Sequence, residues 1–156
     1  MRLTVYTDYT LRTLMYLGVN AGRPATIADI ARAYGISEAH LMKVVHQLGA
    51  AGDIATTRGR NGGIRLAKSA ASLNLGALVR RTETDLDLVP CFEATESCAI
   101  GGACALRAVL SEALAAFLAV LDRYTLADLL VPRRRLAGAL GIPWPPPPMS
   151  AEGAAP

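Results

Sequence analysis

The sequence predicts a mainly α-helical protein with one small β-hairpin and one long helix that pairs with a second copy. Apolar residues recur at helical spacing in three short segments of the first 50 residues. Two short strand-like runs around a Gly-rich turn follow at residues 54–66, and a longer apolar stripe runs from residue 104 to residue 124. A helix-turn-helix followed by a basic hairpin predicts a winged helix-turn-helix with a long dimerisation helix appended.

Capping residues and apolar stripes predict the first three helices. Thr7 or Asp8 caps the first, a capping box at Thr26 opens the second, and Gly35 ends it. Ser37 caps the third helix after a tight turn. The three stripes are Leu11, Leu14, Met15 and Gly18; Ile27, Ile30, Ala31 and Tyr34; and Leu41, Val44, Val45 and Leu48.

The remaining elements follow in order. Strands at 54–57 and 64–66 form the wing, Asn74 caps a short helix within 72–83, and a long helix begins near Cys104. That helix is more apolar than one contact face requires, so we expect it to pack on a second copy as well as on its own domain. We expect a winged helix-turn-helix domain at 1–83, a long cysteine-containing loop at 84–104, a dimerisation helix and a short capped helix at 104–131, and a disordered Pro-rich tail at 132–156.

Length and composition limit the chain to one compact domain with a short appendage. It has 156 residues, of which 52% are hydrophobic, so a second catalytic domain would not fit. No run reaches the roughly 18 uncharged apolar residues of a membrane span. The first residues, MRLTVYTDYTLR, lack the apolar core of a signal peptide. We expect a cytoplasmic protein without a membrane partner.

Positive charge is concentrated in the first half of the chain. Residues 1–83 carry 11 Lys and Arg against 5 Asp and Glu, a net +6, and residues 84–156 carry 5 against 8, a net −3. Such segregation is typical of a nucleic-acid-binding surface. We expect double-stranded DNA as the partner. For a dimer the operator would be a pseudo-palindrome with half-sites about one helical turn apart or a multiple of it.

Two surfaces are predicted to contact the DNA. The outward face of the third helix enters the major groove, where Lys43 is the best candidate for a phosphate or guanine contact. The hairpin tip enters the minor groove, whose negative potential attracts Arg. The predicted set is Ser37, Ala39, His40, Lys43, His46, Arg58, Gly59, Arg60 and Arg65.

All three cysteines lie in one segment. Cys91 and Cys98 are separated by six residues and Cys98 and Cys104 by five, which suits neither a C-x-x-C redox pair nor a zinc ribbon. Three thiolates beside Gly101 and Gly102 favour an iron–sulfur cluster, with structural zinc or a thiol switch as alternatives. A cluster takes four ligands. From the residues alone, the fourth is Asp8, Glu93, Glu96, a histidine or a small molecule.

Four segments lie in the order of a known family: the opening MRLTVYTDYTLRTLMYL, the ADIARAYGIS segment, the RGRNGGIRL wing and the three-cysteine loop. Over about residues 1–131 they resemble the Rrf-type winged-helix regulators. Within this family the chain is similar to the nitric-oxide-sensing repressors. Members that regulate cluster biogenesis use a histidine after their third cysteine, whereas this chain has Leu106 and Arg107 there and no histidine beyond His46.

The resemblance implies a function. Asp8 would complete a [4Fe-4S] cluster across the interface of a homodimer, with [2Fe-2S] as a degraded or alternative form. Nitric oxide would dismantle the cluster and release the repressor from DNA. A carboxylate binds iron more weakly than a thiolate, which suits a ligand that is displaced. Arg12, one turn after Asp8, is expected to orient it.

Other functions compete with this one. Within the same family, the chain could respond to iron, cluster supply or redox state, and from another class it could be a cluster carrier or a thiol redox protein. An enzyme is disfavoured because the sequence has no nucleophile–base pair and both histidines fall on the presumed recognition helix. A carrier has no need of a basic wing.

Overall fold

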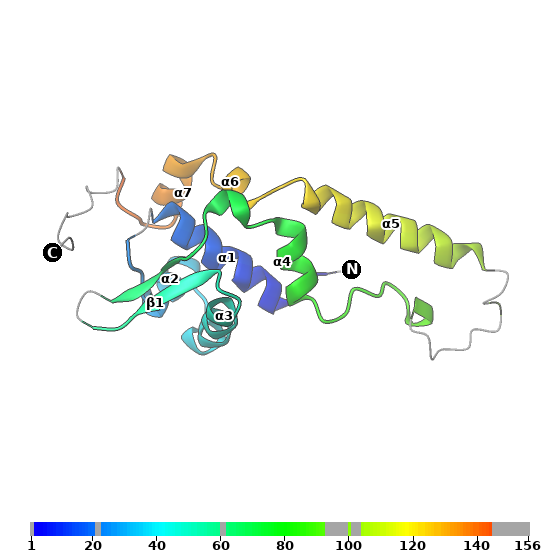
Figure 1. The fold of residues 1–156 in the computed structure, drawn as a ribbon, viewed down its shortest axis with the longest axis horizontal. Coiled ribbons are helices and arrows are strands. Elements are labelled where there is room, and N and C mark those ends of the chain that lie inside the picture. Colours follow the sequence, from blue (N-terminus) through cyan, green and yellow to red (C-terminus); the bar gives the residue numbers. More distant parts are fainter. Residues whose placement is uncertain (1, 21–22, 60–61, 93–99, 101–103, 145–156) are drawn as a thin grey trace.

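A computed structural model describes all residues except 1, 21–22, 60–61, 93–99, 101–103 and 145–156 (Figure 1). The described chain is mostly helical with one antiparallel hairpin, so the predicted fold class is confirmed. The helices are α1 (Val5–Val19), α2 (Ile27–Tyr34), α3 (Glu38–Ala50), α4 (Leu75–Thr82), α5 (Ala105–Asp122), α6 (Leu126–Leu129) and α7 (Arg133–Ala139), with short 3-10 turns at Ala70–Ser72 and Pro90–Phe92. The strands are β1 (Ile54–Thr57) and β2 (Gly63–Leu66).

The capping signals placed most helix starts correctly. Thr26 and Asp29 form a complete capping box at α2, and Gly35 ends that helix in the left-handed conformation with a φ of 64°. Asn74 Oδ1 accepts from the backbone N–H of Ala77 at 2.9 Å, and Thr125 opens α6 with a second capping box. Ser37 is the N-cap of α3, although its side chain makes no capping hydrogen bond.

The predicted cap of α1 was wrong. The helix begins at Val5, and its N-cap is Thr4, whose Oγ1 accepts from the N–H of Thr7 at 3.2 Å. A residue far along the chain also binds Thr4, since Glu83 Oε1 accepts a hydrogen bond from the Thr4 N–H at 2.8 Å. Thr7 is buried and donates to Thr82 Oγ1 at 2.8 Å. A local pattern could not reveal these tertiary partners.

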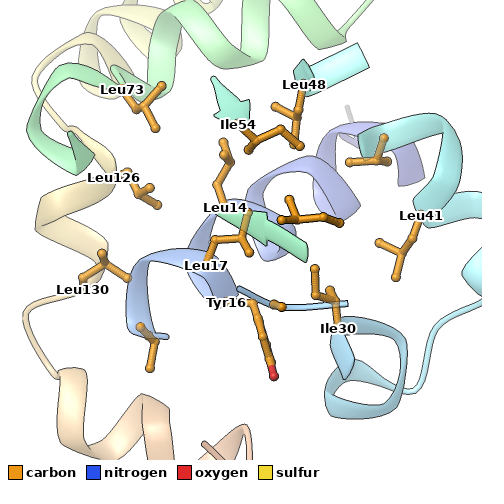
Figure 2. Packing of buried hydrophobic residues seen from close by; sticks show 14 of the residues in the cluster. Leu14, Tyr16, Leu17, Ile30, Leu41, Leu48, Ile54, Leu73, Leu126 and Leu130 are labelled. Carbon is orange, nitrogen blue, oxygen red and sulfur yellow. The ribbon is translucent and has the colours of Figure 1, made fainter. Parts of the chain in front are cut away.

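Helix α1 lies at the centre of the hydrophobic core. Leu14 and Leu17 on α1 are fully or almost fully buried, and side chains of α2, α3, β1 and α6 surround them (Figure 2). The surrounding buried residues include Ile30, Leu41, Val44, Leu48, Ile54 and Leu126. Burying side chains of this size stabilises a domain by about 2 kcal/mol each. The core therefore fixes the orientation of α3 relative to α1.

A buried carboxylate ties the base of the wing to α4. Asp53 precedes β1 and is 1% exposed, and its Oδ1 accepts from Lys68 Nζ at 2.7 Å. Its Oδ2 accepts from Nη2 of Arg81, near the end of α4. The hairpin pairs Ile54 with Leu66 and Thr57 with Gly63. Because both cations bind one carboxylate, Asp53 determines where the wing and α4 meet.

Helix α5 is attached to the rest of the molecule at its C-terminal end. Arg80 binds Asp122 through two hydrogen bonds of 2.6 and 2.7 Å, and Asn74 Nδ2 donates to the carbonyl of Asp122 at 2.7 Å. From there the helix extends away from the body of the protein (Figure 1). No residue of α5 is fully buried, and of the side that we expected to pack on its own domain, Leu121 near the C-terminal end packs against the core. No helix among the described residues is long and apolar enough to cross a membrane.

The start of the expected disordered tail is ordered. Residues 133–139 form α7, Ala137 is fully buried, and Arg133 Nη2 donates to the carbonyl of Gly18 in α1 at 2.6 Å. Leu130 packs on Gly18, where any larger side chain would overlap it. The prediction of disorder from residue 132 was wrong for this stretch, because its apolar residues find partners on α1. Residues 145–156 lie outside the described residues.

The Asp53 ion pairs lead to a stability prediction. Asp53→Asn should lower the free energy of unfolding by about 2 kcal/mol, since two hydrogen bonds to cations are weakened in a buried site. Urea unfolding followed by circular dichroism measures this loss. Glu112→Gln, at an exposed site on α5, should change stability by less than about 0.5 kcal/mol. Equal losses in the two variants would contradict a structural role for Asp53.

Candidate functional site

The outward face of α3 carries the residues predicted to read DNA. Leu41, Val44 and Leu48 are buried against the core, which turns the opposite face of the helix to solvent. The exposed residues of that face are Ala39, His40, Met42, Lys43, His46 and Gln47. Met42 is 55% exposed, a high value for a large apolar side chain without a partner. This face has the shape and donor groups that a major groove accepts.

His40 lies beside α1 as well as on the α3 face. The rings of Tyr9 and His40 are 6.1 Å apart between centroids and tilted by 44°. Tyr9 directly follows Asp8 in α1, so the recognition helix contacts the helix turn that carries the candidate fourth ligand. Sequence periodicity could not reveal this contact, because it depends on how α1 and α3 pack.

Within the described part of the wing, the basic residues of the predicted set do not all lie at the tip. Arg58 is exposed at the end of β1, and Gly59 has a φ of 107°, a conformation that favours glycine at the turn. Arg65 lies on β2 rather than at the tip, and its Nη2 donates to Thr57 Oγ1 at 3.2 Å. Arg60 falls outside the described residues. Arg58 and Gly59 therefore lie beside the turn and Arg65 along the side of the wing, and their contacts with DNA stay predictions.

Asp8 is paired with Arg12 on the outer surface of α1. Arg12 Nε lies 2.9 Å from Asp8 Oδ1 and 2.8 Å from Oδ2, and both side chains are nearly half exposed. This hydrogen bond raises the pKa of Arg12. The Arg12 guanidinium also lies 5.5 Å from the ring centroid of Tyr34 at the end of α2. Burial raises the pKa of Tyr34 to about 12, so the ring stays neutral and attracts the cation through its π face.

A groove of about 620 Å³ surrounds this pair. Its lining is mostly apolar apart from Arg2, Asp8 and Arg12, and the other lining residues are Leu3, Val5, Tyr9, Leu11 and Ile36. Val5 is 53% exposed. An exposed apolar groove of this kind is suited to binding another protein segment. The carboxylate inside it could then bind a metal centre carried by that segment.

The structure describes only part of the predicted thiol set. Cys104 is a partly exposed free thiol at the N-cap of α5, and Cys91 lies in the 3-10 turn Pro90–Phe92. Cys98 and the alternative ligands Glu93 and Glu96 fall outside the described residues, as does the side chain of Cys91. Among the described residues no three His, Cys, Asp or Glu side chains gather closely enough to bind a metal ion. Cys104 lies at the start of α5, and that end of the helix extends away from α1, which carries Asp8 (Figure 1).

Sequence reasoning missed a cleft between α3 and the end of α4. It measures about 520 Å³ and includes Lys43 and His46 from the predicted set, together with Tyr6, Arg81 and Thr84, which were not predicted. The basic pair Arg80-Arg81 was a signal in the sequence. Its location beside α3 depends on the Asp53 ion pair, which the sequence does not reveal.

Comparison with known proteins agrees with this geometry. Residues 3–132 match the Rrf2 family, described as "Iron-dependent Transcriptional regulator". The chain is 54% identical over 142 residues to the HTH-type transcriptional regulator NsrR of Geobacillus kaustophilus, covering 90% of this chain and 97% of that one. It is 50% identical to NsrR of Bacillus subtilis, with 83% and 90% covered. The solved structure of CymR, the global cysteine regulator of B. subtilis, is similar with a TM-score of 0.67 at 26% identity, covering 83% of this chain and 95% of that one.

The exposed face of α3 leads to a prediction about nucleic-acid binding. Lys43→Gln should weaken binding to duplex DNA and reduce the slope of log K against log salt by about 0.9, the contribution of one phosphate contact. Arg134→Gln removes the same charge from α7, which lies on the other side of α1 from α3, and should leave the slope unchanged (Figure 1). Fluorescence anisotropy over a range of salt concentrations measures both. Equal slopes for the two variants would exclude Lys43 from the interface.

Proposed function

The chain belongs to the Rrf2 family of iron-dependent transcriptional regulators, and on this basis we propose that it is a repressor that senses nitric oxide through an iron–sulfur cluster. Its relatives are named transcriptional regulators, and it is a DNA-binding protein rather than an enzyme. The observation that carries the proposal is the exposed carboxylate of Asp8, which lies in an apolar groove on the helix that contacts the recognition helix.

The DNA-binding surface is proposed to combine α3 and the wing. Two such units in a homodimer would read a pseudo-palindromic operator, with each α3 in a major groove and each wing in the adjoining minor groove. The exposed α3 face and Arg58 support this arrangement. The predicted contact residues Ser37, Ala39, His40, Lys43, His46, Arg58, Gly59, Arg60 and Arg65 remain proposals.

The proposed dimer pairs α5 with its counterpart in a second copy. Leu106 and Val109 are 61% and 59% exposed, and Val120 is 45% exposed, along a helix that buries no residue in its own chain. Exposing apolar side chains along a helix of this length to water is unfavourable. The same surface of a second copy would bury them in a symmetric dimer. The same pairing would bring the cysteine segment of one subunit to the Asp8 groove of the other.

The residues present fit an iron–sulfur cluster. Cys104 is a free, partly exposed thiol, and Asp8 has a carboxylate open to solvent. We propose Cys91, Cys98 and Cys104 of one subunit and Asp8 of the partner subunit as ligands of a [4Fe-4S] cluster, with [2Fe-2S] as an alternative form. When bound, the cluster supplies iron that reacts with nitric oxide.

Arg12 is proposed to position Asp8 for this role. A carboxylate has about four lone-pair sites, so one oxygen can bind iron while the other keeps its hydrogen bond to Arg12. Arg12 also contacts the Tyr34 ring, and Tyr9 contacts His40. Release of Asp8 would free Arg12 next to Tyr34 of α2, and the neighbouring Tyr9–His40 contact offers a route from this turn of α1 to the recognition helix.

One anaerobic titration tests the proposed function. The cluster-loaded protein should bind duplex DNA and lose that binding after a few equivalents of nitric oxide, with iron chelator and oxygen acting more slowly. Visible absorption follows the cluster and fluorescence anisotropy follows the DNA. A colourless protein that binds DNA equally well would sink the proposal. Release by chelator but not by nitric oxide would favour an iron-responsive regulator, which the family description also fits.

The fourth ligand has its own test. Asp8→Ala should leave the apo fold intact, because Asp8 is on the surface, but make the cluster less stable or change its reaction with nitric oxide. Absorption decay and nitric oxide kinetics measure this, with Glu112→Ala as a carboxylate control on α5. Cluster spectra and kinetics equal to those of the wild type would remove Asp8 from the ligand set.

A further inference from the structure

The cleft between α3 and α4 is lined by two walls of different origin. We call it the α3–α4 cleft. Met42, Lys43, His46 and Gln47 of α3 form one wall, and Tyr6 of α1 with Arg81, Thr82 and Thr84 forms the other. The cleft measures about 520 Å³. It opens beside the exposed face of α3, because Lys43 and His46 belong to both surfaces.

The chemistry of the lining suits an anion. Lys43 and Arg81 are cations, and none of the described residues that line the cleft is Asp or Glu. Tyr6, Gln47 and Thr84 add neutral hydrogen-bond donors. Asp53, behind Arg81, is already balanced by Lys68, so the three groups together keep one net positive charge.

Arg81 is held in place before any ligand arrives. Its Nη2 donates to the buried carboxylate of Asp53, and its side chain remains 44% exposed. A guanidinium has five N–H donors in a rigid plane, so donors remain free on the side that faces the cleft. An arginine fixed in this way loses little conformational entropy when it binds phosphate.

We propose that the α3–α4 cleft binds a backbone phosphate of the DNA strand that borders the major groove occupied by α3. Arg81 is its principal ligand, and Lys43 and the Tyr6 hydroxyl assist. This inference rests on the DNA binding in the proposed function and adds a contact outside the recognition helix and the wing. Contacts of this kind determine register and orientation on the duplex.

The position of the cleft also connects this phosphate contact to the cysteine segment. Thr84 is the second residue after α4 on the path to the cysteine segment, and the first, Glu83, is hydrogen-bonded to Thr4 at the start of α1. Any rearrangement of the cysteine segment that moves Thr84 changes a wall of the cleft. The phosphate contact is thus the part of the DNA interface closest along the chain to the proposed cluster ligands.

Salt dependence of DNA binding is the first test. The full-length, cluster-loaded protein is titrated with a mixed-sequence DNA duplex several helical turns long. Arg81→Gln should reduce the slope of log K against log salt by about 0.9, as expected for one lost phosphate contact. Arg134→Gln removes the same charge from α7, which lies on the other side of α1 from α3, and should keep the wild-type slope (Figure 1). Equal slopes for Arg81→Gln and the wild type overturn the proposal.

A second measurement separates a contact from a loss of stability. Arg81→Gln leaves Asp53 with Lys68 alone, so it also lowers thermal stability. Duplexes that each carry one neutral methylphosphonate are therefore compared between wild type and variant. One methylphosphonate position should weaken DNA binding by the wild type but not by Arg81→Gln. Methylphosphonates at the other sensitive positions should weaken binding by both proteins. If each methylphosphonate lowers the affinity of both proteins for DNA by the same factor, Arg81 contacts no phosphate.

The remaining outcomes are also decisive. A wild-type protein that binds no DNA overturns both this inference and the proposed function, whereas wild-type binding with an unchanged phosphate pattern in Arg81→Gln overturns this inference alone. Inorganic phosphate is added at constant ionic strength as a third arm. If it binds the wild type but not Arg81→Gln, and no methylphosphonate position depends on Arg81, the cleft is a site for a free anion rather than for DNA.

Discussion

The burial of α1 is the constraint on which the rest of the structure depends. Helices α2, α3, α4, α6 and α7 and strand β2 all pack on it, and Leu14 has no exposed surface. The two ends of α1 have different surroundings: Asp8 lies in a surface groove near one end, and Arg133 binds the Gly18 carbonyl near the other. Because α1 contacts both the recognition helix and the proposed ligand groove, neither can shift without repacking this core.

The sequence was sufficient for the elements that are specified locally. Thr26 with Asp29, Gly35 and Asn74 set helix boundaries through short-range hydrogen bonds, and the structure has those boundaries. The features it could not provide depend on distant partners. Glu83 binds the N-cap Thr4 from far along the chain, and α7 is ordered because its apolar residues and Arg133 find partners on α1. Arg81 borders α3 while it binds the buried carboxylate of Asp53. The proposed cysteine ligands were chosen by residue type and by their clustering in one segment, and their spacing alone predicts no three-dimensional arrangement.

Two features of the described chain are incomplete in a single copy. Helix α5 buries none of its residues, and the Asp8 groove contains one candidate ligand without thiols near it. The proposed symmetric dimer would complete both at once, if pairing α5 with its counterpart also brings a cysteine segment to each groove. Folding, assembly and sensing would then share the same surfaces, and a change at one of them would affect the others.

The ordered C-terminal segment has a spectroscopic consequence. Trp144 is the only tryptophan of the chain, and Arg133 lies 5.9 Å from the centroid of its ring while also binding the end of α1. Indole fluorescence therefore reports on the attachment of α7 to α1, and far-UV circular dichroism reports on the helices as a whole. Trp144 thus serves as an intrinsic fluorescent probe near the end of α1 opposite Asp8, without chemical modification.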